Sequence, residues 1–453
     1  MEQAPQNTAP KNAVEAPPRP ADINATGLDL AFIINLIAKG MYLENLEEAS
    51  QITQAIKLST NIVNGVTQEM LDRKLIHAAG STGVGALSSI RYQLTREGQQ
   101  VALDACNQNQ YFGPAPVTLE DFQARVLAQK IAGEWVSKEN IAEAFADIIV
   151  PENFVKRLGP AINSGHSILI YGPAGNGKTT VAEKVAAIFE SVVYIPHCIE
   201  IEGNIIKVFD PAVHKAVGQA EKVESSRPSL RRERSDQRWV ACQRPVVVTG
   251  GELTMEMLDL KFNEFAKFYE APLHMKALNG TFIIDDFGRQ RVSPEEILNR
   301  WIVPLQTRID NLTLHSGKAF TIPFDELLIF STNLAPDDLM DPAFLRRIPY
   351  KLETYEPSKD AFRQIFTAVA AKQGLQLTDE IFDYVVRELQ ETVKKPLACY
   401  QPKFIVDQVI AACKYEGIAP IITEAFVADA MSNLYVHDSS YVGQVGTGDQ
   451  NSD

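Results

Sequence analysis

The chain has 453 residues, of which 45% are hydrophobic and 22% are charged, a composition typical of globular proteins. Its 43 Lys and Arg residues against 57 Asp and Glu residues give a net charge of −14, which argues against non-specific nucleic-acid binding by the whole chain. No run approaches the ~20 apolar residues that a membrane span needs. The five cysteines have no CxxC spacing, so we expect reduced thiols in a cytoplasmic protein with no membrane span.

The first quarter of the chain divides into a leader and a small helical domain. Residues 1–26 are rich in proline and poor in large apolar residues, which predicts a disordered leader. Residues 27–112 contain three helical stretches, two strand-like stretches around a Gly/Ser-rich segment, and a further helix. Three helices followed by a two-stranded ribbon resemble a winged-helix domain.

A winged helix commonly reads DNA through its third helix. Here Ser59 and Thr60 open that helix, and its only basic residues, Arg73 and Lys74, come at its end. Residues 27–112 hold six Lys and Arg against eight Asp and Glu, a net charge of −2. A DNA reader normally carries a basic stripe. The pattern therefore favours contact with a protein, and DNA binding stays open as the alternative.

The rest of the chain predicts a larger α/β protein. Helical segments connect the two parts, and strands alternate with helices from Ile168 onward, which indicates a parallel sheet. The predicted divisions are connecting helices in 113–150, an α/β nucleotide-binding domain in 151–356, an α-helical lid in 357–438 and a disordered tail in 439–453.

A phosphate-binding loop is the strongest signal in the sequence. An apolar strand ending near Ile170 leads into a GxxxxGK[ST] string, and an amphipathic helix follows. Glycines let backbone N–H groups turn toward phosphates, Lys178 can reach the β- and γ-phosphates of ATP, and the Thr179 hydroxyl is placed for Mg²⁺. The predicted nucleotide-binding residues of the loop are Gly172, Pro173, Ala174, Gly175, Asn176, Gly177, Lys178, Thr179 and Thr180.

A second strand ends in two carboxylates. The run Phe282–Ile284 is typical of a buried strand, and Asp285 and Asp286 follow it. Asp285 is the predicted metal-binding carboxylate beside Thr179. Asp286 stands where related ATPases usually have a glutamate that activates the attacking water, and its side chain is one methylene shorter.

These motifs resemble those of AAA+ ATPases. A third apolar strand ends in Ser331, Thr332 and Asn333, and the string FLRRI follows. The resemblance, which covers about residues 148–435, implies that Asn333 positions the hydrolytic water. It also implies that Arg347, or failing that Arg346, is an arginine finger that reaches the γ-phosphate of a neighbouring subunit. A homohexameric ring follows from the same resemblance.

A predicted hairpin and a lysine in the predicted lid indicate the subclass of AAA+ ATPase that the chain resembles. Ser316 and Gly317 separate two β-rich arms before the third strand, as in the pre-sensor-1 hairpin clade of MoxR-like ATPases and enhancer-binding activators. In the lid, Lys403 matches the clade's second sensor arginine, although lysine cannot form a bidentate fork. The resemblance also places a pore loop near residues 255–265. Its candidate exposed residues are Met255, Met257 and Phe262, with packing in a core as the competing interpretation.

An arginine-rich stretch precedes the second strand of this domain. It has almost no apolar residues, so we expect a mobile, solvated loop, with contact to an acidic partner or a nucleic acid as the alternative. Its arginines are Arg227, Arg231, Arg232, Arg234 and Arg238.

The sequence therefore predicts an α/β P-loop AAA+ protein with a helical lid and an N-terminal winged-helix-like domain. The resemblance implies that it binds and hydrolyses ATP with Mg²⁺ to remodel an unidentified protein substrate. Two alternatives stay open, a DNA-associated regulator and a nucleotide switch with little turnover.

Overall fold

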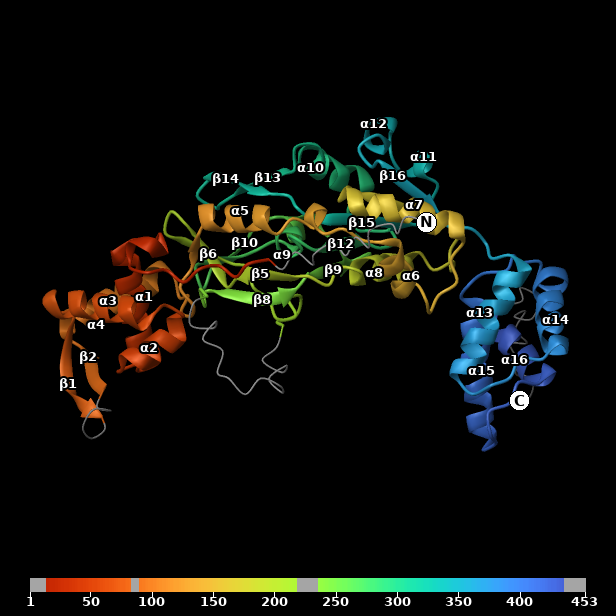
Figure 1. Ribbon diagram of the computed structural model, residues 1–453, viewed down its shortest axis with the longest axis horizontal. Helices are drawn as coiled ribbons and strands as arrows, with labels where there is room; N and C mark the ends of the chain where they lie inside the picture. The colour runs from red at the N-terminus through yellow and green to blue at the C-terminus, as the bar shows by residue number, and fades with distance from the viewer. Residues whose placement is uncertain (1–13, 83–88, 218–234, 436–453) are drawn as a thin grey trace, which may run out of the picture.

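The computed structural model describes residues 14–82, 89–217 and 235–435 (Figure 1). Figure 1 shows an N-terminal helical part at one end of the long axis, a central α/β part, and a helical bundle at the other end. Residues 1–13, the predicted tail 439–453 and most of the arginine-rich stretch lie outside the described residues.

The segment 14–26 makes defined contacts, which corrects the prediction of a disordered leader for these residues. Pro18 forms a β-bridge with Ser235, and the backbone N–H of Asp236 donates to the carbonyl of Pro17 at 2.9 Å. A short 3-10 helix, η1, spans Asn24–Thr26. Proline has no backbone N–H group and interrupts helices and strands, so a proline-rich segment shows no helical or strand periodicity in its sequence. Its carbonyl groups can still accept hydrogen bonds.

Arg238 also departs from its prediction. Its side chain is 3% exposed and pairs with Asp236 at 2.8 Å (Nη2–Oδ2). The Nη1 atom donates to the carbonyls of Thr26 at 3.1 Å and Pro116 at 3.0 Å. Arg238 therefore joins three segments in the interior and does not belong to a solvated charge run.

The N-terminal part has the predicted order of elements. Helix α3 begins after Ser59, whose side chain accepts from the backbone N–H of Ile62, and its buried face packs on α1 and α2. Strands β1 and β2 form an antiparallel ribbon. The elements are α1 (Leu30–Leu43), α2 (Ala49–Ile56), α3 (Thr60–Asp72), β1 (Ile76–Thr82), β2 (Ser89–Leu94) and α4 (Arg96–Gln108).

The connecting segment is helical, as predicted, with one short strand added. Its elements are β3 (Val117–Thr118), α5 (Leu119–Ala128) and α6 (Lys138–Ala144), and α7 (Glu152–Ser164) follows as the first helix of the predicted nucleotide-binding domain. Asn279 accepts a hydrogen bond from Gln129 at 2.9 Å and donates to Asp325 at 2.8 Å, which ties this segment to the base of the central sheet.

A five-stranded parallel sheet forms the core of the α/β part. Its strands are β4 (Ile168–Tyr171), β9 (Val246–Thr249), β12 (Thr281–Ile284), β15 (Leu327–Thr332) and β16 (Tyr350–Glu353). Their spatial order is β16-β4-β15-β12-β9, which is 5-1-4-3-2 in chain order. The phosphate loop follows β4, and α8 (Lys178–Ala187) follows the loop. This sheet confirms the predicted α/β fold class of P-loop AAA+ type.

A second five-stranded sheet and two antiparallel pairs extend the α/β part. The second sheet has the order β10-β11-β7-β6-β3 and is mixed in direction. The predicted hairpin around Gly317 is present as β13 paired with β14. The strands are β5 (Val192–Pro196), β6 (Cys198–Ile201), β7 (Asn204–Lys207), β8 (Trp239–Gln243), β10 (Lys261–Asn263), β11 (Phe268–Glu270), β13 (Ile309–Thr313) and β14 (Ala319–Pro323).

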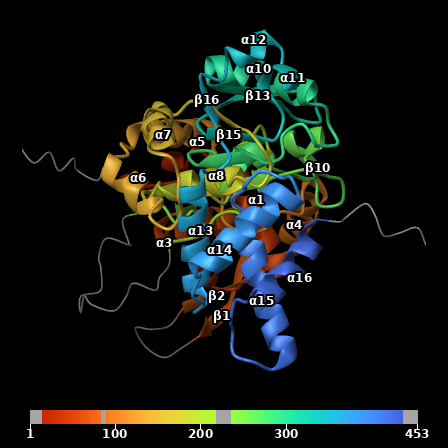
Figure 2. The same ribbon diagram turned by 90° about the vertical axis from the view of Figure 1, so that its right-hand side faces the viewer.

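Helices complete the α/β part and form the lid, which Figure 2 shows in front of the sheet. Around the sheet lie α9 (Leu273–Lys276), α10 (Pro294–Thr307), α11 (Pro336–Leu339) and α12 (Pro342–Leu345). The lid comprises α13 (Lys359–Lys372), α14 (Asp379–Arg387), α15 (Gln401–Glu416) and α16 (Glu424–Leu434), and these enclose a separate apolar core. In the described part of the chain, no helix has the length and apolar character needed to cross a bilayer.

Candidate nucleotide site

One large cleft lies between the carboxyl edge of the parallel sheet and the lid. Its volume is about 1180 Å³. Open α/β sheets bind ligands at this edge, where the loops after the strands converge. Most of the predicted site residues line the cleft, namely Ala174, Gly175, Asn176, Gly177, Lys178, Thr179, Thr180, Asp285, Asp286, Asn333 and Lys403.

The backbone of the phosphate loop depends on glycine. Gly172 has φ +137°, and a Cβ atom there would lie 2.2 Å from the carbonyl oxygen of Thr354. Gly177 has φ +79° and occupies the N-cap of α8. These residues hold the loop in conformations that other amino acids rarely adopt. The loop therefore turns tightly enough to present backbone N–H groups and the positive end of α8 to the cleft.

Lys178 and Thr179 are held at the first turn of α8. The Lys178 ammonium donates to the carbonyls of Gly172 at 2.9 Å and Pro173 at 2.8 Å, so these two residues orient the lysine without lining the cleft. Burial lowers the pKa of Lys178, and the carboxylates of Asp286 and Asp285 oppose this shift. An anionic ligand beside the ammonium would relieve the same desolvation cost.

Thr179, in the first turn of α8, contacts Asp285, which follows β12. The Thr179 hydroxyl donates to the Asp285 carboxylate at 2.8 Å (Oδ2) and lies 3.0 Å from Oδ1. One hydroxyl and one carboxylate suit Mg²⁺, which usually takes its other ligands from water and substrate phosphates. Among the described residues, no group of three or more His, Cys, Asp and Glu side chains could hold a metal.

Asp286 and Asn333 are joined by a side-chain hydrogen bond. Asn333 Nδ2 donates to Asp286 Oδ1 at 2.9 Å, which links the ends of β12 and β15. Asp286 is exposed to the cleft and has φ +48°, a left-handed conformation that is uncommon for aspartate. Gln290 holds this turn by donating to the carbonyl of Asp285 at 3.0 Å, with the carbonyl of Asp286 at 3.3 Å.

The lid contributes a cation to the cleft. Lys403 lies in the first turns of α15 and forms an ion pair with Asp407 at 2.6 Å. Both side chains line the cleft, so the structure brings the predicted lid lysine to the same place as the phosphate loop.

Sequence reasoning missed an apolar lining of the cleft. The side chains come from the segment before α7, from the first turn of α7 and from α13, and they can enclose a flat apolar group. The signal in the sequence is the apolar run IIVP before the phosphate loop, although such a run is also typical of a core segment. The residues are Ile148, Ile149, Val150, Phe154, Ile365 and Val369.

Arg346 and Arg347 do not line this cleft. Both follow α12, where Arg346 is exposed and Arg347 is half-buried with its guanidinium 5.9 Å from the ring of Phe344. The backbone N–H of Arg347 donates to the carbonyl of Phe344 at 2.8 Å. The structure thus places neither arginine beside the phosphate loop of its own chain.

The pore-loop candidates divide between packed and exposed positions. Met255 packs against the core around the central sheet, and Phe262 packs on Tyr269 with ring centroids 4.8 Å apart. Both are therefore core contacts, and only Met257 is exposed as predicted, at 39%. Sequence reasoning did not single out Phe265, which is 90% exposed between β10 and β11.

The sheet order and the cleft define a P-loop protein with an AAA+ ATPase-like fold. Residues 358–433 match the model of a family described as a domain of unknown function, DUF8689. No curated protein sequence matches the chain.

Two solved structures illustrate the similarity in fold. The RuvB Holliday junction branch migration motor of Thermotoga maritima is 17% identical, with a TM-score of 0.33 over 64% of this chain and 71% of that one. NtrX from Brucella abortus is 13% identical, with a TM-score of 0.39 over 66% of this chain and 58% of that one.

Proposed function

We propose that the protein is a Mg²⁺-dependent ATPase that assembles as a ring, most simply a homohexamer, and remodels a protein partner in the manner of MoxR-like ATPases. One observation carries the ATPase proposal. The Thr179 hydroxyl meets the Asp285 carboxylate at 2.8 Å, in the same cleft as Lys178 and the Asp286–Asn333 pair. This combination of hydroxyl, cation and carboxylates is the one that phosphoryl transfer requires.

ATP fits the two kinds of surface in the cleft. The phosphate loop and Lys403 provide N–H groups and cations for the phosphates, and the apolar lining around Ile149 and Phe154 suits a purine base. Thr179 and Asp285 would hold Mg²⁺, and the ion when bound neutralises charge on the phosphates and orients them.

In the proposed hydrolysis, the carboxylate of Asp286 after β12 accepts the proton of the attacking water. Asp286 takes a proton from a water molecule whose oxygen forms a bond to the γ-phosphorus, while the bond from that phosphorus to the bridging oxygen breaks in line. Asn333 orients Asp286 and the water. Lys178 stabilises the charge that develops on the phosphate oxygens.

In a ring, the arginines after α12 would lie next to the nucleotide site of a neighbouring subunit. Since Arg347 does not line the cleft of its own chain, we infer that it completes the site of a neighbouring subunit, with Arg346 as the second candidate. The β13–β14 hairpin supports the MoxR-like assignment, and the five free thiols support a cytoplasmic location.

The N-terminal part serves best as a winged-helix-like adaptor for a protein. Helix α3 carries no lysine or arginine, and Arg73, which follows it, is paired with Glu69 at 2.7 Å. DNA binding needs cations that neutralise phosphates, and this surface offers few.

Phosphate release from purified full-length protein tests the proposal. We expect Mg²⁺-dependent ATP hydrolysis that falls on the order of 100-fold or more in Lys178→Ala, because one cation at the developing charge is removed. Lys156→Ala is the matched control, since Lys156 is an exposed lysine on α7 that is paired with Glu152 and does not line the cleft. If Lys178→Ala folds normally and hydrolyses ATP at the parent rate, the proposed site is wrong.

A further inference from the structure

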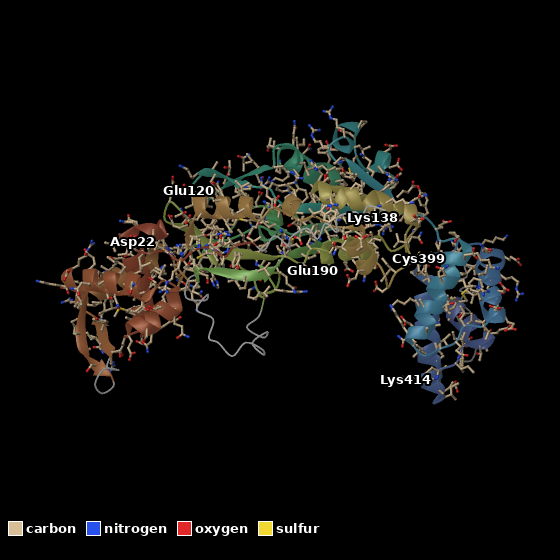
Figure 3. The ribbon with its side chains drawn as sticks, viewed as in Figure 1. Asp22, Glu120, Lys138, Glu190, Cys399 and Lys414 are labelled. Atoms are coloured by element: carbon tan, nitrogen blue, oxygen red, sulfur yellow. The ribbon has the colours of Figure 1, made fainter. Side chains whose placement is uncertain are left out.

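The segment of the lid just before α15 lies directly against the phosphate loop. The backbone N–H of Tyr400 donates to the carbonyl of Gly175 at 3.0 Å, and the N–H of Cys399 donates to Asn176 Oδ1 at 3.2 Å. Figure 3 labels Cys399 at the end of the lid nearest to the α/β part and Lys414 at the far end. Two hydrogen bonds therefore connect the first residues before α15 to the loop that faces the proposed phosphates.

The ring of Tyr400 lies against the backbone of Gly175. A Cβ atom at Gly175 would come within 2.3 Å of Cδ1 and 2.9 Å of Cε1 of that ring. Gly175 also has φ +76°, which disfavours any side chain. Glycine is thus needed twice at this position, once for the loop conformation and once for the aromatic contact.

The other side of Tyr400 is tied into the interior of the lid. Its hydroxyl lies 3.3 Å from the hydroxyl of Tyr435, which follows α16. Gln401 is fully buried and donates to the Tyr435 hydroxyl at 2.8 Å, while its Oε1 accepts from the N–H of Ala398 at 2.8 Å. These bonds join the segment around Tyr400, in the middle of the lid sequence, to Tyr435 at its end, so the ring is held by the lid.

The contact between the lid and the phosphate loop also involves Asn176. Its side chain is 7% exposed and lines the cleft, and its Oδ1 is occupied by the N–H of Cys399. Its Nδ2 has no hydrogen-bond partner among the described residues. A buried donor without a partner is unfavourable until an acceptor enters the cleft. The lid contact thus leaves a donor available for an anionic ligand.

We propose that Tyr400 is a positioning residue that couples the orientation of the lid to the conformation of the phosphate loop. The contact joins protein to protein and needs no nucleotide to form. It orders Gly175 and Asn176 before ATP arrives, which lowers the entropic cost of binding. The effect on nucleotide affinity rests on the proposed ATPase function, whereas the contact itself does not.

Hydrogen exchange of the full chain without nucleotide tests the contact. In Tyr400→Ala we expect peptides that contain Gly175 and the start of α15 to exchange on the order of tenfold faster, as for a typical coupling between two sites. Tyr400→Phe keeps the ring and should exchange like the parent there. Tyr415→Ala is the control, because Tyr415 lies near the far end of the same helix and is 89% exposed.

Nucleotide kinetics test the positioning role. We expect Tyr400→Ala to raise the KM for ATP by about tenfold and to change kcat much less, since the residue orders the loop before binding. Tyr400→Phe and Tyr415→Ala should stay near the parent KM. If Tyr400→Ala has no cooperative unfolding transition, Tyr400→Leu replaces it, which keeps apolar bulk and loses the flat ring.

Two outcomes overturn the proposal. One is exchange near Gly175 in Tyr400→Ala that equals exchange in Tyr415→Ala. The other is an equal fall in kcat and kcat/KM without a change in KM, which would place the effect in the chemical step. A parent protein that binds no nucleotide would refute the ATPase function, and the exchange experiment would still decide whether the contact orders the loop.

Discussion

Asn333 Nδ2 donates to Asp286 Oδ1 at 2.9 Å, and this bond joins the ends of two neighbouring parallel strands. This bond orients the carboxylate of Asp286, a residue whose backbone has φ +48°. Unusual backbone conformations of this kind often occur at functional sites, where the surrounding structure maintains them. Gln290 maintains this one through its bond to the carbonyl of Asp285. The pair is therefore oriented by the protein before any water molecule is bound.

The proposed roles of the two aspartates predict different defects. Asp286→Asn should bind ATP normally and lose on the order of 100-fold or more in turnover, because a carboxamide cannot accept the proton. Asp285→Asn should weaken the Mg²⁺-dependence of binding. A fluorescent ATP titration with and without Mg²⁺, combined with single-turnover phosphate release, separates the two. Stalled turnover with unchanged Mg²⁺-dependence in Asp285→Asn would contradict the assignment.

Mixing two inactive variants tests whether Arg347 acts between subunits. Arg347→Ala leaves its own cleft intact, and Lys178→Ala leaves its own arginine intact. We expect each alone to be nearly inactive, because an arginine supplied by a neighbour contributes on the order of 10³-fold or more. Mixed rings should regain part of the activity in a phosphate-release assay.

The control for this mixture is assembly, measured by light scattering for each variant and for the mixture. If both variants assemble and their mixtures never exceed the sum of the separate rates, Arg347 does not act on a neighbour. Arg346→Ala would then be mixed with Lys178→Ala in the same way.

Short sequence motifs were enough to identify most of the residues that line the cleft. The phosphate loop, Asp285 and Asn333 depend on short motifs next to apolar strands, and the parallel sheet brings strand ends together by its topology. Lys403 is also found where the resemblance implied, beside the cleft.

Features that depend on distant segments could not be read from local patterns. Arg238 follows a run of polar residues in the sequence, but its acceptors at Thr26 and Pro116 are more than 100 residues away. Phe262 packs on Tyr269 because β10 pairs with β11 within the second sheet, and Phe265 is exposed because it lies in the turn between these two strands. The stacking of Tyr400 on Gly175 is equally non-local.

Duplex DNA should bind the full-length protein only weakly. We expect a dissociation constant no tighter than the non-specific range of about 10⁻⁴ to 10⁻⁶ M at ~150 mM salt, because α3 lacks basic residues. Fluorescence anisotropy with random and mixed duplexes measures this, and a salt titration reports how many phosphates are contacted. Sub-micromolar affinity at that salt would support the DNA-associated regulator instead.

Glu326 gives the protein a predicted pH dependence. Its side chain is 1% exposed and neither carboxylate oxygen has a hydrogen-bond partner among the described residues. Burial raises its pKa well above the usual value, and the nearby Asp310 carboxylate adds to the shift. Asp310 itself stays ionised, with a pKa of about 2, because bonds from His274 and Arg300 outweigh the effect of burial.

The direction in which pH changes the stability follows from the binding of a proton to Glu326. A carboxyl group whose pKa is raised by folding favours the folded state at low pH, and this contribution is lost as the pH rises through the raised pKa. Glu326→Leu should therefore raise the Tm relative to the parent at pH 8, by about 2–4 °C for each kcal/mol gained, and the difference should shrink toward pH 5. Intrinsic-fluorescence melting at several pH values measures it. A difference that grows as the pH falls would contradict the prediction.

The buried Arg238–Asp236 pair has a consequence for where the chain can be shortened. A protein that started at Gly27, the first residue of the N-terminal helical domain predicted from sequence, would lose the Thr26 carbonyl that accepts from Arg238. A guanidinium with 3% exposure would then lack one acceptor in a place that water does not reach, and such a loss typically costs about 1–3 kcal/mol or more. Residues 14–26 thus act as a part of the α/β domain, and their removal would weaken a region that lies far from them in sequence.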